Sequence, residues 1–218
     1  MKQTVRILGR SSSHFTRVTR IFAAELGVAY ELQPIYDMSS LDPATFGGHP
    51  AMKLPSMQID GRTIFGMQNI CRALARIAPR RAKIIWPETI DDDRLANAQE
   101  LVLHSMATQV QIVLGTVVAK LPASNPFFGK LQTGFEGCLA WLDRELPSIL
   151  QALPPRDLSL FEVTLYCLID HLKLRPTVPL EPYAQLGRFR EDISSRVTNL
   201  VDPMPKSHQL FAGFDLLA

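Results

Sequence analysis

The stretch that decides the fold is residues 49–75, HPAMKLPSMQIDGRTIFGMQNICRALA. Asp60-Gly61 separates two short apolar segments, a pattern typical of a β-hairpin with a two-residue turn. Pro55 heads the first segment, where a residue without an N–H suits a strand start or a sheet edge. X-Pro bonds are also the only peptide bonds for which the cis form is common. After Gly66, apolar residues recur at three- and four-residue spacing and predict a helix, at Ile70, Ala73, Leu74 and Ile77.

The residues before this stretch predict a strand, a helix and a second strand. Thr4–Leu8 is a short β-rich run, and Phe15–Leu26 has the spacing of a helix that ends at Gly27. Val28–Ile35 is the second strand candidate, and Met38–His49 is rich in Ser, Asp, Pro and Gly and is predicted to be a loop. The first half therefore reads β-α-β, a loop, and then β-β-α.

The second half is predicted to be entirely helical. From Asp91 onward no segment has a convincing strand pattern, and four helices are expected, at 91–120, 127–153, 158–172 and 182–201. We therefore expect an α/β domain over residues 1–78, a linker over 79–90 and an all-helical domain over 91–218.

Composition sets the protein class. The chain has 218 residues, 46% hydrophobic and 20% charged, as in soluble globular proteins, and its formal charge of +2 gives no electrostatic basis for a nucleic-acid partner. The longest strongly apolar stretch, 110–121, is shorter than the roughly twenty residues of a membrane span. Residues 1–10 lack an apolar signal core, so we expect a cytoplasmic protein without a membrane segment. The three cysteines are far apart and, like the histidines, show no metal-ligand spacing, so no metal is expected.

The order of loop, proline, strand, Asp-Gly turn, strand and helix resembles the second half of a thioredoxin-like domain, in the form found in cytosolic glutathione transferases. The resemblance implies the glutathione transferase fold, glutathione as co-substrate, a homodimer and a detoxifying enzyme. It also implies a cis bond at Pro55, with the backbone of Leu54 offered to glutathione. A similar helix start is present at Leu158–Val163, which reads as a capping box of Ser159 and Glu162 flanked by a hydrophobic staple.

The resemblance places the chemistry at Ser12. In serine-type members a hydroxyl at the start of the first helix hydrogen-bonds the glutathione sulfur and favours the thiolate. Counting back from Val18 puts Ser12 at that position, with Ser13 and His14 where similar proteins have the last two residues of a Ser-Ser-Cys group. Ser11 takes the role if the loop is one residue longer. The other interpretation is that these serines only cap a helix.

The carboxylate-binding motif departs from the family pattern. Members normally carry Glu or Asp followed by Ser at the start of the third helix, where this chain has Gly66-Met67. Backbone N–H groups at a helix start still bind carboxylates, and the amide of Gln68 is a further donor. Lys53 matches a position that in the family contacts the glycine carboxylate, but it is also explained as a solvated loop lysine.

A small hydrophobic electrophile is the expected second substrate. His14 is predicted at the mouth of its pocket, and His104 and Thr108 lie on the first helix of the second half, which lines that pocket in similar proteins. A polar helix face toward solvent explains the latter two equally well. Two alternatives to conjugation stay open. One is a non-catalytic binding or assembly protein, and the other is a glutathione-dependent isomerase or dehalogenase.

Overall fold

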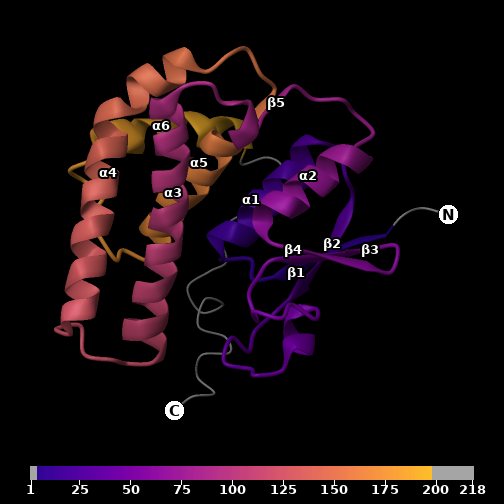
Figure 1. Ribbon diagram of the computed structural model, residues 1–218, viewed down its shortest axis with the longest axis horizontal. Helices are drawn as coiled ribbons and strands as arrows, with labels where there is room; N and C mark the ends of the chain where they lie inside the picture. Colours follow the sequence, from indigo (N-terminus) through magenta and orange to yellow (C-terminus); the bar gives the residue numbers. More distant parts are fainter. Residues whose placement is uncertain (1–3, 198–218) are drawn as a thin grey trace. The chain divides into compact units, whose positions relative to one another are not determined.

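The structure is a computed structural model that describes the backbone of residues 4–197 and the side chains of residues 4–194 (Figure 1). The described chain divides into two compact units, one up to Ala82 and one over Lys83–Arg196. The division falls inside the segment predicted as a linker, residues 79–90. Each unit is described by itself.

The first unit is a four-stranded sheet with two helices. Its elements are β1 (Val5–Gly9), α1 (His14–Glu25), β2 (Tyr30–Pro34), the 3₁₀ turn η1 (Pro43–Phe46), β3 (Ser56–Ile59), β4 (Arg62–Phe65) and α2 (Met67–Ile77). The strand order is β2-β1-β3-β4, with β1 parallel to β2, β3 antiparallel to β1, and β4 antiparallel to β3. Helices α1 and α2 pack on each other and lie on the same side of the sheet, while the connection from β2 to β3 lies on the other side (Figure 1). This is the predicted thioredoxin-like arrangement.

The turn residues adopt the conformations that the sequence predicted. Asp60 and Gly61 have φ of 50° and 72°, the left-handed pair that a two-residue hairpin turn needs. Gly27 has φ of 68° and ends α1, and its N–H donates to the carbonyl of Ala24. The Leu54-Pro55 bond is cis.

The connection between β2 and β3 corrects the prediction of a plain loop at 38–49. Its turn η1 is capped by Asp42, whose carboxylate accepts from the N–H of Ala44 at 2.9 Å. Phe46 is fully buried in a cluster with Leu8 and Ile35. Hydrophobic periodicity did not predict this turn, because a single aromatic residue among polar ones has no period. That residue, Phe46, nevertheless anchors the connection to the sheet.

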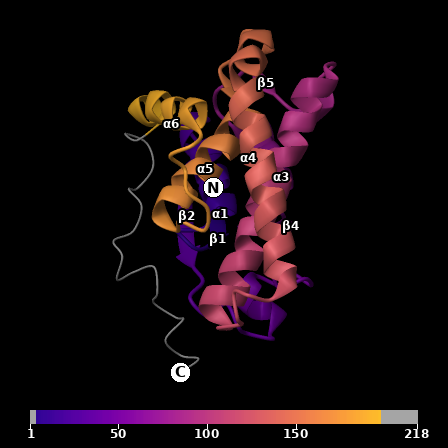
Figure 2. The same cartoon turned by 90° about the vertical axis from the view of Figure 1, so that its left-hand side faces the viewer.

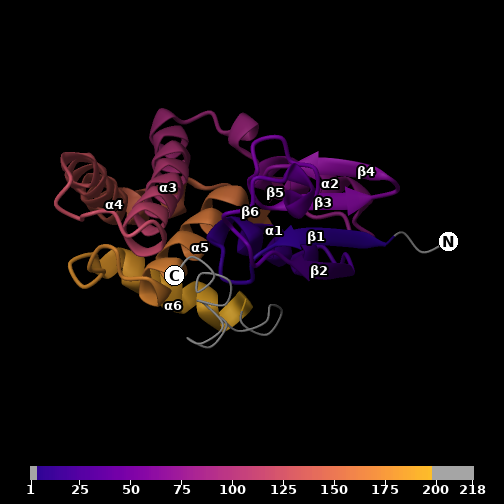
Figure 3. The same cartoon turned by 90° about the horizontal axis from the view of Figure 1, so that it is seen from below.

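The second unit is predominantly helical. Its elements are β5 (Ile84–Ile85), the 3₁₀ turn η2 (Pro87–Thr89), α3 (Asp93–Ile112), the π-helical continuation η3 (Val113–Val118), α4 (Pro126–Ala152), β6 (Leu158–Ser159), α5 (Leu160–Leu174) and α6 (Ala184–Val197). Helices α3 and α4 run side by side (Figure 2), and α5 packs against α3. Figure 3 shows α6 beside α5, and the guanidinium of Arg190 joins the two helices by an ion pair of 2.6 Å with Asp170. Residues 198–201, which were predicted to continue the last helix, lie outside the described residues.

Two details of this unit differ from the predictions. Strands β5 and β6 pair in parallel, so part of the predicted linker belongs to the second unit and that unit contains a short strand pair. The predicted capping box is only half formed. Ser159 Oγ accepts a hydrogen bond from the N–H of Glu162 at 3.5 Å. The Glu162 carboxylate, however, accepts a hydrogen bond from Arg156 Nη2 at 2.6 Å. A charged partner outcompetes the neutral N–H that a capping box offers.

One helix of the described residues, 93–118, is long and apolar enough to cross a membrane by length and composition alone. Of its most apolar 18 residues, 33% are buried. Core helices of soluble proteins meet the same criterion. Gln99 on this helix is buried and its Nε2 reaches Thr164 Oγ1 of α5 at 3.3 Å, a contact that favours a core helix.

Candidate functional site

The sheet brings four loop segments to one end of the first unit. Strands β1 and β2 are parallel and both end there, β3 begins there, and β4 ends there. Hydrogen bonds extend the register past the strands, from the N–H of Ile35 to the carbonyl of Gly9 at 3.0 Å and from the N–H of Gly66 to the carbonyl of Pro55 at 3.3 Å. The loop after β1, the start of the β2–β3 connection, the cis proline and the start of α2 are therefore neighbours.

The three serines of the loop after β1 lie in different environments. Ser13 is the N-cap of α1, and its Oγ accepts from the N–H of Thr16 at 3.3 Å. Ser12 is only 6% exposed, and both Ser11 and Ser12 line a cavity. The capping interpretation thus applies to Ser13, and the prediction for Ser12 or Ser11 stays open.

His14 corrects an expectation about exposure. It was expected at the mouth of the site, but it is the first residue of α1 and only 1% exposed, and its ring packs 4.7 Å from that of Phe15. It is not among the residues that line the cavity. Sequence spacing placed the residue correctly along the chain but did not show that the helix start turns its side chain inward.

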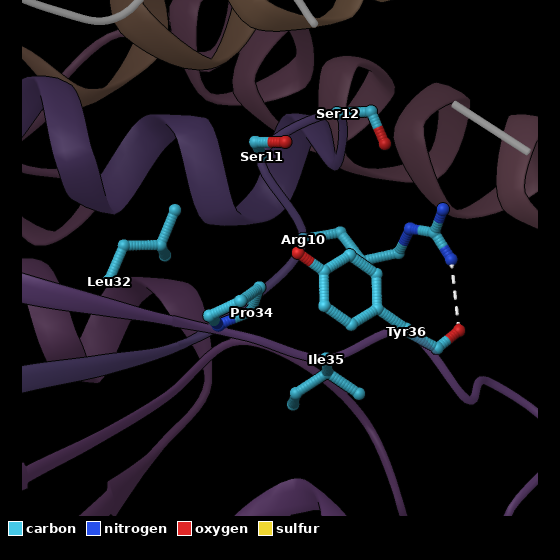
Figure 4. Close-up of a pocket in the computed structure, with 7 residues that line it drawn as sticks. All are labelled: Arg10, Ser11, Ser12, Leu32, Pro34, Ile35 and Tyr36. Atoms are coloured by element: carbon cyan, nitrogen blue, oxygen red, sulfur yellow. Dashed lines mark hydrogen bonds between the residues drawn. The ribbon is translucent and has the colours of Figure 1, made fainter. Parts of the chain in front are cut away.

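The cavity has a volume of about 510 Å³ and lies beside the serine loop and β2 (Figure 4). Its lining comes from the loop after β1, from β2 and from the residues that follow β2: Arg10, Ser11, Ser12, Leu32, Pro34, Ile35 and Tyr36. The Arg10 side chain is 8% exposed, and its Nη1 donates to the carbonyl oxygen of Tyr36 at 3.2 Å. Sequence reasoning missed Arg10 and Tyr36. The available indication was that Arg10 is the first residue after β1 and Tyr36 the second after the parallel strand β2, because such residues meet at one end of a sheet.

The start of α2 has free hydrogen-bonding capacity. Gly66 precedes it with φ of 83°, and among the described residues no side chain caps this helix. The first intrahelical bond runs from the N–H of Ile70 to the carbonyl of Gly66, so the N–H groups of Met67 and Gln68 have no acceptor within the helix. The partial positive charge of the helix start favours an anion at this position.

The side chains of these two residues behave differently. Met67 is only 5% exposed, so its thioether belongs to the interior and only its backbone is available to a ligand. Gln68 is half-buried, and its Oε1 accepts from Arg72 Nη1 at 3.4 Å. This contact directs the amide oxygen toward Arg72 and leaves the NH₂ group as a donor on the other side.

The loop before the cis proline holds a histidine that the sequence analysis did not single out. The ring of His49 packs 4.6 Å from that of Phe65 at the end of β4, and its Nδ1 accepts from the N–H of Ala51 at 3.1 Å. Burial, and secondly the charge of Lys53, lower the pKa of His49 below its usual value. The imidazole is therefore neutral at neutral pH. Lys53 itself is exposed.

The remaining predicted residues, His104 and Thr108, lie on α3 in the second unit. The His104 side chain is 66% exposed, and its Nε2 lies 3.0 Å from Glu100 Oε1 one helical turn earlier. Thr108 is half-buried. A contact of either residue with a substrate stays a prediction. In the part of the chain that the structure describes, no group of three or more His, Cys, Asp or Glu side chains is arranged to hold a metal ion.

Comparisons with known proteins bear on the fold of the chain and on the kind of domain that its first unit is. Residues 12–77 match the family model described as glutathione S-transferase, N-terminal domain. A comparison with curated protein sequences finds no match.

Solved structures match over nearly the whole chain. A glutathione S-transferase from Methylobacterium radiotolerans, in complex with glutathione sulfonate, is 19% identical with a TM-score of 0.70, and the match covers 94% of this chain and 97% of that one. A glutathione transferase family member from Pseudomonas fluorescens, with bound glutathione, is 17% identical with a TM-score of 0.75 and coverage of 91% and 99%. A delta-class glutathione transferase from Nilaparvata lugens is 14% identical with a TM-score of 0.69 and coverage of 98% and 100%. The chain therefore has the glutathione transferase fold, and its residues 12–77 are similar to the N-terminal domain of that family.

Proposed function

We propose that this protein binds glutathione at the described end of the sheet and transfers its sulfur to an electrophilic small molecule. The observation that carries the proposal is the meeting of three features there: the cis Leu54-Pro55 bond, the uncapped start of α2 and the serine loop with its buried Ser12. Each provides one kind of contact that a tripeptide thiol with two carboxylates needs.

The contacts with glutathione follow from the backbone and side-chain groups at this end of the sheet. The backbone of Leu54, ahead of β3, pairs with the peptide backbone of glutathione as an added strand does. The N–H groups of Met67 and Gln68, with the NH₂ group of Gln68, receive the γ-glutamyl carboxylate. Lys53 is exposed and supplies a cation for the glycine carboxylate. In this chain, which has Gly66 and Met67 where the family has an acidic residue and a hydroxyl, backbone N–H groups and the Gln68 amide thus supply the donors.

Ser12 supplies the chemistry in this proposal. Its hydroxyl donates to the sulfur, and because a hydrogen bond to the charged form favours that form, the thiol pKa falls from its ordinary value near 8.5. The thiol proton leaves to solvent, and the thiolate attacks an electrophilic carbon. A carbon–sulfur bond forms, and the leaving group departs with the electron pair of the bond that breaks. The cytoplasmic location that the sequence predicts and the homodimer that the resemblance implies belong to the same proposal.

The test is the rate of glutathione conjugation to chlorodinitrobenzene as a function of pH. Ser12→Ala is expected to lower kcat/KM at neutral pH by about tenfold to a hundredfold, the equivalent of one hydrogen bond to a charged group. The pH profile should also shift to higher pH, because the thiolate loses its donor. Ser11→Ala is the matched variant, since Ser11 lines the same cavity.

The outcomes separate the alternatives. An unshifted profile for Ser12→Ala with a shifted one for Ser11→Ala would move the role to Ser11. No conjugation by the wild-type protein would favour the non-catalytic alternative, which the buried side chain of Met67 also supports because it puts a thioether where the family has a hydroxyl.

A further inference from the structure

We propose that the imidazole of His49 binds glutathione, and that His49 and Lys53 together receive the glycine carboxylate. The identity of the ligand rests on the proposed function, in which Lys53 alone has this role. His49 is then a second donor to the carboxylate, in the loop ahead of the cis Leu54-Pro55 bond. A histidine in this position also makes the ligand bind together with a proton.

A tight turn holds His49 beside Lys53. The N–H of Met52 donates to the carbonyl oxygen of His49 at 2.8 Å, and Met52 has φ of 49°, in the left-handed region. The chain therefore reverses direction just before Lys53. Burial, and secondly the charge of Lys53, lower the pKa of His49, and the second effect requires the two side chains to be near each other. Leu54, whose backbone is proposed to pair with glutathione, comes next in the chain.

The imidazole of His49 has one nitrogen available to a ligand. Nδ1 accepts a hydrogen bond from the N–H of Ala51 at 3.1 Å, so the proton of the neutral ring is on Nε2. The ring packs against that of Phe65 with 4.6 Å between their centroids, and this contact holds the plane of the imidazole. Among the described residues none accepts a hydrogen bond from Nε2, and Nε2 is not one of the buried polar atoms. Nε2–H is therefore an oriented donor that is open to a ligand.

The elements around the ring supply no anion to this pair. The N–H of His49 contacts the turn η1, whose acidic residue Asp42 uses its carboxylate to cap that turn. On β4, Arg62 lies 3.9 Å from Asp60, and the first turn of α2 has no acidic residue. In the part of the chain that the structure describes, no acidic side chain forms an ion pair with Lys53 or His49. A carboxylate for these two donors therefore comes from a ligand.

A bound carboxylate changes the protonation of His49. Without a ligand, the imidazole is neutral at neutral pH because burial and Lys53 lower its pKa. A carboxylate next to the ring favours the imidazolium and offsets the charge of Lys53, so the pKa of His49 is higher in the complex than in the free protein. The complex thus holds more protons than the free protein between these two pKa values. By linkage, the ligand binds more tightly as the pH falls through this window.

Calorimetric titration with S-methylglutathione measures the proton uptake, because the methyl group removes the thiol proton from the ligand. Titrations of the full-length protein in two buffers of different ionisation enthalpy give the number of protons taken up. For the wild type we expect uptake of part of a proton near about pH 6, and an affinity that rises by up to about tenfold per pH unit on acidification. The glycine ethyl ester of S-methylglutathione has no charge at this end and should bind without the uptake.

His49→Asn is the informative variant. The Asn side chain still accepts from the N–H of Ala51 two residues on, but it does not titrate. This variant should bind S-methylglutathione without proton uptake and about tenfold more weakly than the wild type near about pH 6. The matched control is Arg62→Gln, which removes an exposed cation from β4 at its ion pair with Asp60 and should keep both the uptake and the affinity.

The outcomes separate this inference from the proposed function. Equal proton uptake with the ester, or uptake that persists in folded His49→Asn, would overturn the pairing of His49 with the glycine carboxylate. Binding by the wild type without uptake between about pH 5 and pH 7 would also overturn it, while glutathione binding stands. No binding by the folded wild type would overturn both. Binding with the expected uptake but without conjugation of chlorodinitrobenzene would support the role of His49 and contradict the transferase function.

Discussion

Three consecutive serines at the start of α1 differ in what surrounds their oxygens. Ser13 is committed to the helix cap, whereas Ser11 and Ser12 face the cavity beside Arg10. One residue of difference along the chain therefore separates a structural hydroxyl from one that is available to a ligand. Position in the loop follows from sequence spacing, but the direction of each hydroxyl depends on where the helix begins.

His49 makes the stability of the site loop depend on pH. Its pKa in the folded protein is lowered, first by burial and then by Lys53, from an unfolded value of about 6.5. The folded state therefore binds fewer protons than the unfolded state between these two pKa values, and the free energy of unfolding falls as pH drops through this window. Protonation also removes Nδ1 as acceptor for the N–H of Ala51.

The check is urea denaturation of the wild type and of His49→Gln at pH values above and below about 6.5. The stability advantage of the wild type over His49→Gln should shrink as the solution is acidified, because Gln does not titrate. An advantage that is constant or grows toward acid pH would contradict the assignment of a lowered pKa.

The residues of the site were only partly predictable. The cis bond at Leu54-Pro55 was expected from the resemblance to glutathione transferases, and the position of Gly66 before a helix followed from helical spacing. Burial of His14 did not follow, because a pattern that covers only the first turn of a helix does not determine which way its side chains point. Arg10 was missed for a different reason: a lone arginine after a strand has no motif, and only the sheet register shows which loops it meets.

At the scale of elements, the passage from β1 into α1 depends on the absence of a side chain at Gly9. A Cβ at this position would clash with Thr16 Oγ1 and lie 2.8 Å from Thr16 Cγ2, and Thr16 is fully buried. The carbonyl of Gly9 also accepts a hydrogen bond from the N–H of Ile35, and this bond continues the sheet toward the cavity. The serine loop is therefore positioned by the close packing of the strand end against the helix.

We expect Gly9→Ala to destabilise the protein by about 1–3 kcal/mol through overpacking. Adding Thr16→Ala should recover part of this loss, because the clashing atoms are removed. Gly129→Ala is a matched control on α4, where a Cβ meets no atom within 4 Å and the helix should gain up to about 1 kcal/mol. Melting temperatures of the variants report these effects. If Gly9→Ala lowered the melting temperature equally in the wild-type protein and in the Thr16→Ala variant, the proposed contact would be ruled out.

Element identity was largely predictable, and the exceptions share a cause. The hairpin, α1 and the long helices follow from turn residues and helical periodicity. The strand pair β5–β6 was missed because two residues are too few for a period and their pairing joins segments about seventy positions apart. The capping box was half wrong because Arg156, three residues before Ser159, competes for Glu162.

At the scale of the whole molecule, the sequence supported a thioredoxin-like half followed by a helical half, and the structure has that fold. The division between the compact units falls at residues 82 and 83. Fold alone does not determine the reaction, since one fold hosts many chemistries. The functional argument rests instead on the donors and the charge that the first unit gathers at one end of its sheet.

The central claim is that the start of α2 binds a glutathione carboxylate through backbone N–H groups, and calorimetric titration with glutathione tests it most directly. The informative pair of variants is Met67→Ala and Met67→Pro. Both remove the buried thioether, but only proline also removes the N–H, and proline is tolerated at the first position of a helix.

We expect saturable binding to the wild type at millimolar-range glutathione, and affinity about tenfold to a hundredfold weaker for Met67→Pro than for Met67→Ala, the loss of one hydrogen bond to a charged group. No binding by the folded wild-type protein in that range, or equal affinity of the two variants, would contradict the account.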